Sequence, residues 1–247
     1  MLTDDRTSSA TVLAGRAETL LRESRARGPA AVRDAARHVC LAQPSMGSLW
    51  NLAAAALDPD PNLFERLAAR AVRCPSAVAR YALALLKDDV RRVLTCSRSA
   101  VVEACVRALA VPVVCAESRP GLEGRGLAEA LAANGLPVTV VADAAIGSEF
   151  RAGDVVLVGA DAIAAEWFIN KTGTSQLAAA AQLAGIPAYV VAGREKCVPP
   201  ELARLLTLRH DDPATLWKDA PAGVEVLNPL FEKVAFERVA GVLTDSG

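Results

Sequence analysis

The chain has 247 residues, of which 52% are hydrophobic and only 4% aromatic, and its formal net charge is −1. Ala, Val and Leu dominate the composition, which favours helices packed on a parallel sheet over an aromatic-rich β-sandwich. A near-neutral chain without a dense Lys/Arg tract lacks the electrostatic footprint of a nucleic-acid binder, so direct binding of DNA or RNA is not expected.

The cysteines and histidines bear on compartment and on metal binding. The six cysteines include no CxxC pair, no signal peptide precedes them, and His38 and His210 lie far apart, so we expect reduced thiols in a cytoplasmic protein without a metal site. Charged residues interrupt every apolar stretch of about 18 residues, so no membrane-spanning helix is expected. Neither GxGxxG nor GxxxxGK[ST] occurs, which weakens a dinucleotide-binding or P-loop interpretation, and no cofactor is indicated.

The first third of the chain is predicted to be helical, because its apolar residues recur at helical spacing. The predicted helices span residues 10–25, 30–41, 47–57 and 62–86. The sequence Asp-Pro-Asp-Pro at 58–61 is a strong loop signal between the last two. No strand pattern occurs before Val90, so we expect residues 1–88 to form a helical domain.

From Val90 the pattern changes to short apolar strands that alternate with helices. The predicted strands lie in the sequences RRVLTCS, VPVVCAES, PVTVVAD, VVLVG and PAYVVAG. Strands joined through helices form right-handed crossovers, so this alternation predicts a mainly parallel sheet. We therefore expect residues 89–247 to form a Rossmann-like α/β domain, and the segment from Asn228 onward to end in a helix.

Every predicted strand ends in a polar cluster. The carboxyl ends of parallel strands meet at one edge of a sheet, where ligands bind in open α/β folds. One such cluster would mean little, but five together predict a ligand crevice. The clusters are Thr95–Ser97, Glu117–Arg119, Asp143, Asp161 and Arg194–Lys196.

Asp161 and the residues after it form the most informative stretch. Asp161 follows Val155–Val158, a run without alternation that predicts a strand buried on both faces, so the acid is placed for chemistry at the sheet edge. Lys171 then supplies a cation, and Gly173 and Thr174 offer backbone N–H groups at the start of a helix, which suits a phosphate. A capped helix after a tight turn explains residues 170–174 equally well.

Two other edge residues also allow a functional and a structural interpretation. Arg119 precedes Pro120 and Gly121 in a loop whose backbone can approach a ligand, and its guanidinium can clamp a phosphate. The alternative is a solvated arginine at a strand-to-helix turn. Asp143 either contributes to the crevice or caps a helix that begins near Ala145.

Seven motifs occur in a specific order along nearly the whole chain. They are QPSMGSLWNLAAAAL at 43–57, VLTCSRS at 93–99, AESRPGLEG at 116–124, VADAAIG at 141–147, VGADAI at 158–163, NKTGT at 170–174 and NPLFE at 228–232. Together they resemble the regulatory subunits of translation initiation factor 2B and their enzyme relatives, ribose-1,5-bisphosphate isomerase and methylthioribose-1-phosphate isomerase. The ESRPG-x-EG form looks most like the initiation-factor-like branch.

The resemblance implies roles for several residues. Asp161 matches the aspartate of the isomerases' acid/base pair, Arg119 matches a phosphate-binding arginine, and Asn170 with Lys171 matches a substrate-binding pair. Ser97 holds the position of the catalytic cysteine, with Cys96 beside it.

Two departures from the isomerase pattern bear on catalysis. A serine hydroxyl is a far weaker acid than a thiol, whose ordinary pKa is about 8.5, so Ser97 needs a strong local base to transfer a proton. Cys96 replaces it only if the loop presents that side chain inward, and adjacent residues at a strand end point to opposite faces. Gln43 stands where the isomerases carry an arginine, which removes a cation from the expected substrate site.

Two functions remain open from the sequence. The first is an aldose–ketose isomerase of a sugar 1-phosphate, with Asp161 as the general base and Cys96 or Ser97 as the partner acid. The alternative is a non-catalytic regulatory protein that binds a phosphorylated metabolite and acts through protein association. In both, the resemblance implies a phosphorylated small-molecule ligand and a homodimer. An unrelated nucleotide-binding Rossmann-like module is disfavoured because the glycine fingerprint is missing.

Overall fold

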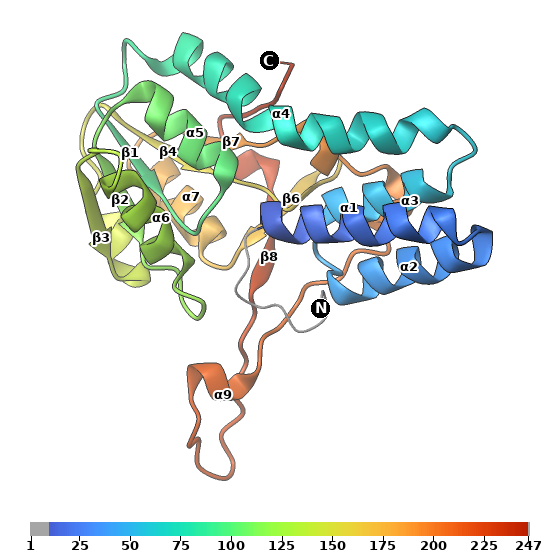
Figure 1. Cartoon of the computed structure of the whole chain (residues 1–247). Helices are drawn as coiled ribbons and strands as arrows, with labels where there is room; N and C mark the ends of the chain where they lie inside the picture. The colour runs from blue at the N-terminus through green and yellow to red at the C-terminus, as the bar shows by residue number, and fades with distance from the viewer. Residues whose placement is uncertain (1–9, 247) are drawn as a thin grey trace.

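Helices and strands occupy separate regions of the computed structural model, which describes residues 10–246. Figure 1 shows helices α1–α3 and the first half of α4 on one side of the molecule, and the strands with their covering helices on the other. Within residues 10–246, no helix combines the length and the apolar character that crossing a membrane requires.

The four N-terminal helices form where the helical periodicity predicted them. Their bounds are α1 Ala10–Ala26, α2 Pro29–Ala42, α3 Gly47–Leu57 and α4 Pro61–Leu86. Pro29 and Pro61 lie in first turns, where a missing N–H costs no hydrogen bond. Asp60 caps α4 by accepting a hydrogen bond from the N–H of Asn62 at 2.9 Å.

Helix α4 contributes to two hydrophobic cores. Its first half packs with α1–α3 through Phe64 and Ala68, whereas its second half packs on the main sheet through Cys74 and Val78. Pro75 lies inside the helix at this change of partner. The proposed domain division at residue 88 therefore follows the change in secondary structure, while the change of core falls earlier, within α4.

The main sheet is parallel, with its six strands in the order β3-β2-β1-β4-β7-β9. Their bounds are β1 Arg92–Thr95, β2 Val113–Ala116, β3 Val138–Val141, β4 Asp154–Val158, β7 Ala188–Val191 and β9 Gly241–Leu243. Strand β1 pairs with both β2 and β4, so the strand order reverses there. In open α/β sheets such a switch point is where ligands bind.

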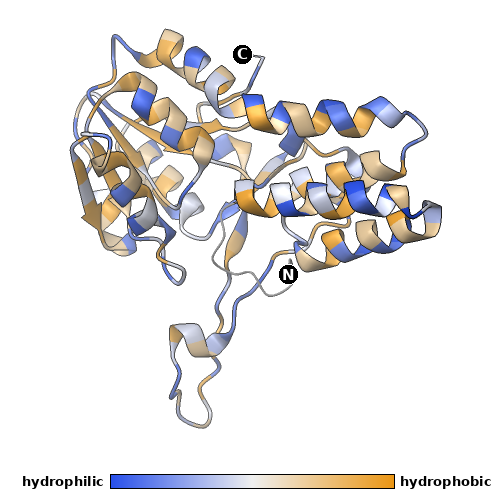
Figure 2. Ribbon diagram, viewed as in Figure 1, coloured by the Kyte–Doolittle hydropathy of each residue, from blue (hydrophilic) through white to orange (hydrophobic). Residues whose placement is uncertain are grey.

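Helices cover both faces of the main sheet, as the α/β interpretation predicted. Helices α5 (Ala100–Leu109) and α6 (Glu123–Ala132) pack with α4 on one face, and α7 (Thr174–Leu183) packs on the other. Val155 and Leu157 of β4 face the first core, whereas Val156 and Val158 face the second. Figure 2 shows the strands as predominantly hydrophobic, consistent with burial on both sides.

A second, antiparallel sheet was not predicted. It has the order β5-β6-β8, with bounds β5 Ala162–Ile163, β6 Trp167–Lys171 and β8 Phe231–Ala235. Asn170 and Lys171, interpreted as part of a turn before a helix, are instead the last residues of β6. In the register of this sheet, Asn170 pairs with Glu232 and Lys171 with Phe231.

The C-terminal segment is extended, so the predicted terminal helix is wrong. After β8 and the short turn η3 (Phe236–Arg238), the chain adds β9 to the edge of the main sheet, where Val242 pairs with Val190. This partner comes from a distant part of the chain, and tertiary pairing overrides local propensity in strands. Residues 209–229, which include the short helix α9 (Pro213–Leu216), project away from the rest of the molecule (Figure 1).

Candidate functional site

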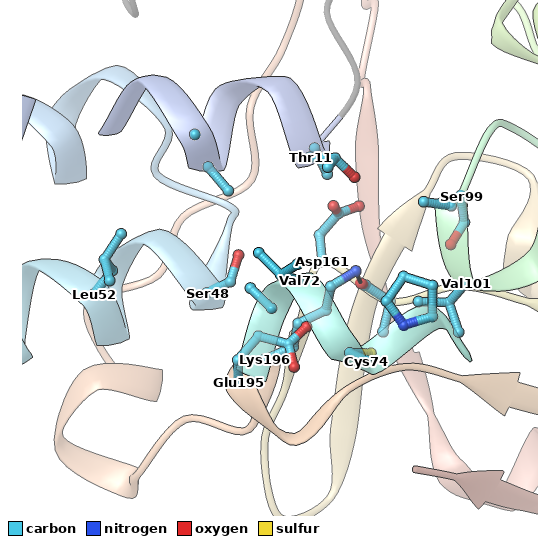
Figure 3. Close-up of a pocket in the computed structure, with 18 of the residues that line it drawn as sticks. Thr11, Ser48, Leu52, Val72, Cys74, Ser99, Val101, Asp161, Glu195 and Lys196 are labelled. Atoms are coloured by element: carbon cyan, nitrogen blue, oxygen red, sulfur yellow. Dashed lines mark hydrogen bonds between the residues drawn. The ribbon is translucent and has the colours of Figure 1, made fainter. Parts of the chain in front are cut away.

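A cavity of about 290 Å³ lies between helices α1, α3 and α4 and the carboxyl edge of the main sheet. Figure 3 shows Thr11, Ser48 and Val72 from these helices around Asp161. The clusters after β1, β4 and β7 line this cavity, whereas those after β2 and β3 do not. Its polar lining from the sheet edge consists of Cys96, Ser97, Arg98, Ser99, Asp161, Asn170, Glu195 and Lys196.

Asp161 is fixed by backbone hydrogen bonds on both sides. Its N–H donates to the carbonyl of Ile169 in β6 at 2.7 Å, and its carbonyl accepts from the N–H of Gly47, the first residue of α3, at 2.8 Å. Burial raises the pKa of the Asp161 carboxyl, and the nearby ammonium groups of Lys196 and Lys171 oppose that rise. A carboxylate whose pKa is raised is a better proton acceptor, so Asp161 is suited to act as a base.

Lys196 and Glu195 join Asp161 in the cavity, as the Arg194–Lys196 cluster predicted, although the sequence analysis gave neither residue a role of its own. Lys196 Nζ donates to the carbonyl of Ala160, which places its ammonium beside Asp161. Glu195 is 6% exposed, burial raises its pKa, and its Oε2 has no hydrogen-bond partner among the described residues. Their position directly after a buried strand was the available signal.

Cys96 is held as a protonated thiol. Its Sγ lies 3.6 Å from Thr174 Oγ1. The Thr174 hydroxyl donates to the carbonyl of Lys171 at 2.6 Å and accepts from Asn170 Nδ2 at 2.9 Å, so the thiol is the donor toward Thr174. Burial raises the pKa of Cys96 to about 11. Cys96 is therefore a poor source of thiolate at neutral pH.

Ser97 and Arg98 form the turn between β1 and α5. Ser97 is half-buried with φ of 63°, and its N–H donates to Ser118 Oγ at 2.6 Å. Arg98 lines the cavity and extends over α6, where its guanidinium lies 3.2 Å from the position that a Cβ would take at Gly126. The sequence analysis did not single out Arg98, which directly follows the predicted Thr95–Ser97 cluster, and its charged end lies over α6, outside the cavity lining.

Lys171 does not line the cavity, because it forms a buried ion pair. Its side chain is 4% exposed, and its Nζ lies 2.7 Å from Glu123 Oε1, at the start of α6. The counter-charge comes from a helix 48 positions away in sequence. The cation expected for a phosphate is therefore neutralised by a carboxylate of the chain itself.

The start of α7 is also occupied by a carboxylate. Glu232 of β8 accepts a hydrogen bond from the N–H of Ser175 through Oε1 at 2.9 Å. Gly173 adopts φ of 100°, which only glycine adopts easily, and Thr174 directs its hydroxyl to Asn170 and Lys171. A turn thus precedes α7 as expected, and the Glu232 carboxylate takes the position at its N-terminus where an anion was expected.

Arg119 and Asp143 lie together at the ends of β2 and β3, outside the cavity lining. The Asp143 carboxylate accepts from the N–H groups of Ser118 and Arg119 at 2.6 and 2.7 Å, so Asp143 stabilises this loop. The Arg119 side chain is 56% exposed and lies 3.5 Å from Glu117. Its arrangement corresponds to the solvated alternative considered for it.

Gln43 is buried at the end of α2, away from the cavity lining. Its Oε1 accepts from Arg209 Nη1 at 2.9 Å. The neighbouring Ser45 hydroxyl donates to the carbonyl of Thr207 and accepts from the N–H of Arg209. In this arrangement Gln43 and Ser45 anchor the strand-connecting segment 207–209 to the helical layer.

Comparison with known protein families shows a match between the sequence of this chain and one family model. The model for the Initiation factor 2 subunit family matches residues 62–247. A protein of Pyrococcus horikoshii, named as translation initiation factor eIF-2B subunit 2-like, is 32% identical over 230 residues, covering 88% of this chain and 80% of that protein. A crystal structure titled as Pyrococcus horikoshii translation initiation factor eIF-2B has a TM-score of 0.84 at 27% identity, covering 100% of this chain and 93% of that one.

Isomerases match over a smaller part of their length. Ribose 1,5-bisphosphate isomerase of Methanocaldococcus jannaschii is 30% identical over 141 residues, covering 56% of this chain and 46% of that protein. Methylthioribose-1-phosphate isomerase of Syntrophotalea carbinolica is 31% identical over 196 residues, covering 69% and 56%. The matches to these two isomerases thus span about half of each enzyme.

Proposed function

The chain belongs to the initiation factor 2 subunit family, which its motifs predicted, and from this membership we propose that it binds a phosphorylated sugar in the cavity beside Asp161. The observation that carries this proposal is the meeting of Asp161, Asn170 and Lys196 in one cavity of about 290 Å³. The Lys196 ammonium suits a phosphate, and a carboxylate with an amide suits sugar hydroxyls. The named isomerase relatives act on sugar phosphates, which supports the same ligand class.

In the described arrangement, direct contacts with the ligand are available to cavity residues only. Asn170 lines the cavity with Asp161 and Lys196 and is placed to contact a sugar. The other expected binding residues do not line it in the described arrangement, and their contacts would require a rearrangement. These residues are Arg119, Lys171, Gln43, Gly173 and Thr174.

Aldose–ketose isomerisation is the catalytic function that Asp161 fits. As general base it would take the proton from C2 of the open sugar, and a proton returned to C1 would complete the shift without changing the composition of the sugar. The raised pKa of Asp161 supports this role. The partner acid would be Ser97 or Cys96, both of which line the cavity.

A non-catalytic regulatory function is the second candidate, and specific observations favour it. Ser97 replaces the thiol, and the proton of Cys96 is committed to Thr174 with a pKa of about 11. A protein named for initiation factor eIF-2B matches over 88% of this chain and 80% of its own length. In this function the same cavity binds a phosphorylated metabolite, and binding is coupled to association with another protein.

Proton NMR and thermal unfolding with the same ligands separate these candidates. Ribose 1-phosphate, ribose 1,5-bisphosphate and methylthioribose 1-phosphate would each be added to the chain and to Ser97→Cys. New ketose resonances with either protein identify an isomerase, whereas a raised melting temperature without turnover identifies a binder. If none of the three ligands is turned over and none raises the melting temperature, the proposed ligand class is refuted.

We also propose a homodimer, as the resemblance implies. A solved complex of this fold, from C. thermophilum, is titled as tetrameric. In the present chain, the projecting segment 209–229 exposes Leu216, Trp217 and Leu227, each about half exposed or more. Association is one way to cover this apolar surface.

A further inference from the structure

The buried ion pair between Lys171 and Glu123 lies next to the proposed ligand cavity. Lys171 and Glu123 both act electrostatically on Asp161, the first lowering and the second raising its pKa, so all three charges are close in space. A lysine that is 4% exposed needs a counter-charge, because an unpaired buried ammonium is costly. In the described arrangement, Glu123 provides it.

Glu123, whose side chain is 28% exposed, makes an incomplete set of interactions for a carboxylate with one buried oxygen. Its Oε1 accepts from Lys171 Nζ at 2.7 Å, while its Oε2 is buried without a hydrogen-bond partner. A carboxylate has about four lone-pair positions to satisfy, so this pairing is a weak one for the charge involved. A ligand group with more acceptor oxygens than the Glu123 carboxylate is therefore a better partner for the Lys171 ammonium.

The backbone around Glu123 limits how this pair can open. Leu122, immediately before it, adopts φ of 59°, and a Cβ on Gly124 would lie 1.8 Å from the carbonyl oxygen of Ala116. The start of α6 is therefore packed against the end of β2 and cannot move freely. The ion pair would open by rotation of the Glu123 side chain while the helix stays in place.

We propose that Glu123 is an internal competitor for the phosphate of the ligand: binding exchanges the Glu123 carboxylate on Lys171 for a phosphate oxygen. The inference rests on the proposed sugar-phosphate function. A phosphate monoester carries a charge of about −1.5 to −2 and three strong acceptor oxygens, so it can displace a carboxylate. A ligand bearing only a carboxylate gains nothing by the exchange. Glu123 thereby selects phosphorylated sugars over sugar acids.

The variant Glu123→Gln tests this role, because it removes the charge and keeps the shape. Calorimetric titration with ribose 1-phosphate and with inorganic phosphate should show affinity raised about 10-fold or more, because the phosphate no longer has to displace a charged acceptor from Lys171. Gluconate, which carries a carboxylate and cannot displace Glu123 in the parent, should gain affinity by a larger factor, so that discrimination against it falls. Glu129→Gln, an exposed position on the same helix, is the matched control and should change neither affinity.

The sign of the effect distinguishes competition from a structural role. A Glu123 that merely supports the fold would lower affinity when it is replaced. If Glu123→Gln does not fold, Glu123→Asp shortens the side chain, weakens the pair and should raise phosphate affinity to a smaller extent. Unchanged or lower phosphate affinity in these variants, with measurable binding by the parent, overturns the inference and leaves the proposed function standing. Binding by none of the proteins overturns both.

Discussion

Asp161 combines the features that a general base requires. Its backbone is fixed between β6 and α3, its carboxyl has a raised pKa, and Lys196 lies beside it. Ser97 and Cys96 offer much less, because a hydroxyl is a weak acid and the buried thiol keeps its proton. At the scale of single residues, Asp161 is thus suited to act as a base, whereas the two predicted partner acids, Ser97 and Cys96, are poor ones.

Replacing Asp161 by asparagine tests the base directly. Asp161→Asn keeps the shape and removes the proton acceptor, so the turnover of an isomerase should fall by about 10² to 10⁴ while ligand binding survives. In a protein that only binds, affinity should stay equal or rise slightly, because a carboxylate beside an anionic ligand is repulsive. Steady-state kinetics and calorimetry make the two measurements, and an isomerase whose turnover is unaffected by Asp161→Asn would contradict the assigned role.

Helix α3 joins the helical layer to the sheet edge, and Gly47 is the point of contact. The N–H of Gly47 donates to the carbonyl of Asp161, and Asn51 of the same helix donates to the carbonyls of Glu195 and Cys197. A Cβ at Gly47 would lie 2.8 Å from Ala162 Cβ and 3.0 Å from the carbonyl of Lys196. The helix packs this closely because residue 47 has no side chain.

Gly47→Ala should therefore separate α3 from the sheet edge. We expect the free energy of unfolding to fall by about 1–3 kcal/mol, as for other overpacked sites, and ligand affinity to fall with it. Gly15→Ala is the control, since a Cβ there has no atom within 4 Å and alanine is favoured within a helix. Urea unfolding of both variants checks this, and equal stability of Gly47→Ala and the parent would show that the contact is not tight.

The elements that periodicity reveals were predictable, and those that depend on distant partners were not. Helices α1–α4 and strands β1–β4 and β7 have apolar patterns of their own. Strands β8 and β9 are defined by pairing with β6 and β7, far away in sequence. The same limit applies to the site. Asp161 directly follows its own strand and was predictable, whereas the partner of Lys171, Glu123, is 48 positions away. The sequence therefore did not reveal that the Lys171 ammonium is paired with a carboxylate.

Buried thiols give the whole molecule a pH-dependent stability. Burial raises the pKa of Cys74, Cys105 and Cys115 to about 12 and that of Cys40 and Cys96 to about 11, from an ordinary value of 9.0. The unfolded chain releases these protons first as the pH rises, so stability is complete below about pH 9 and is lost as the pH climbs toward 11 to 12.

Urea unfolding between about pH 8 and pH 10.5 should show this loss. Cys105→Ala removes one of the thiols and should reduce the slope of unfolding free energy against pH by up to about 1.4 kcal/mol per unit. An identical slope in the parent and in Cys105→Ala would show that this thiol is not protected from titration in the fold.

Assembly is the other property at this scale. Multi-angle light scattering at micromolar concentration should report a mass of two chains, given the proposed homodimer and the exposed apolar residues of segment 209–229. A single-chain mass under these conditions would count against the dimer and leave the cavity assignments unaffected.

The most direct test of the central claim is calorimetric titration of the chain with ribose 1-phosphate and with ribose. We expect saturable binding of the phosphorylated sugar at one site per chain and no binding of ribose. Lys196→Met should weaken that binding about 10-fold or more, because it removes the ammonium beside Asp161, while Lys87→Met, at the exposed end of α4, should leave it unchanged. Equal affinity for ribose, or an affinity that Lys196→Met does not change, would contradict the binding of a phosphorylated sugar in this cavity.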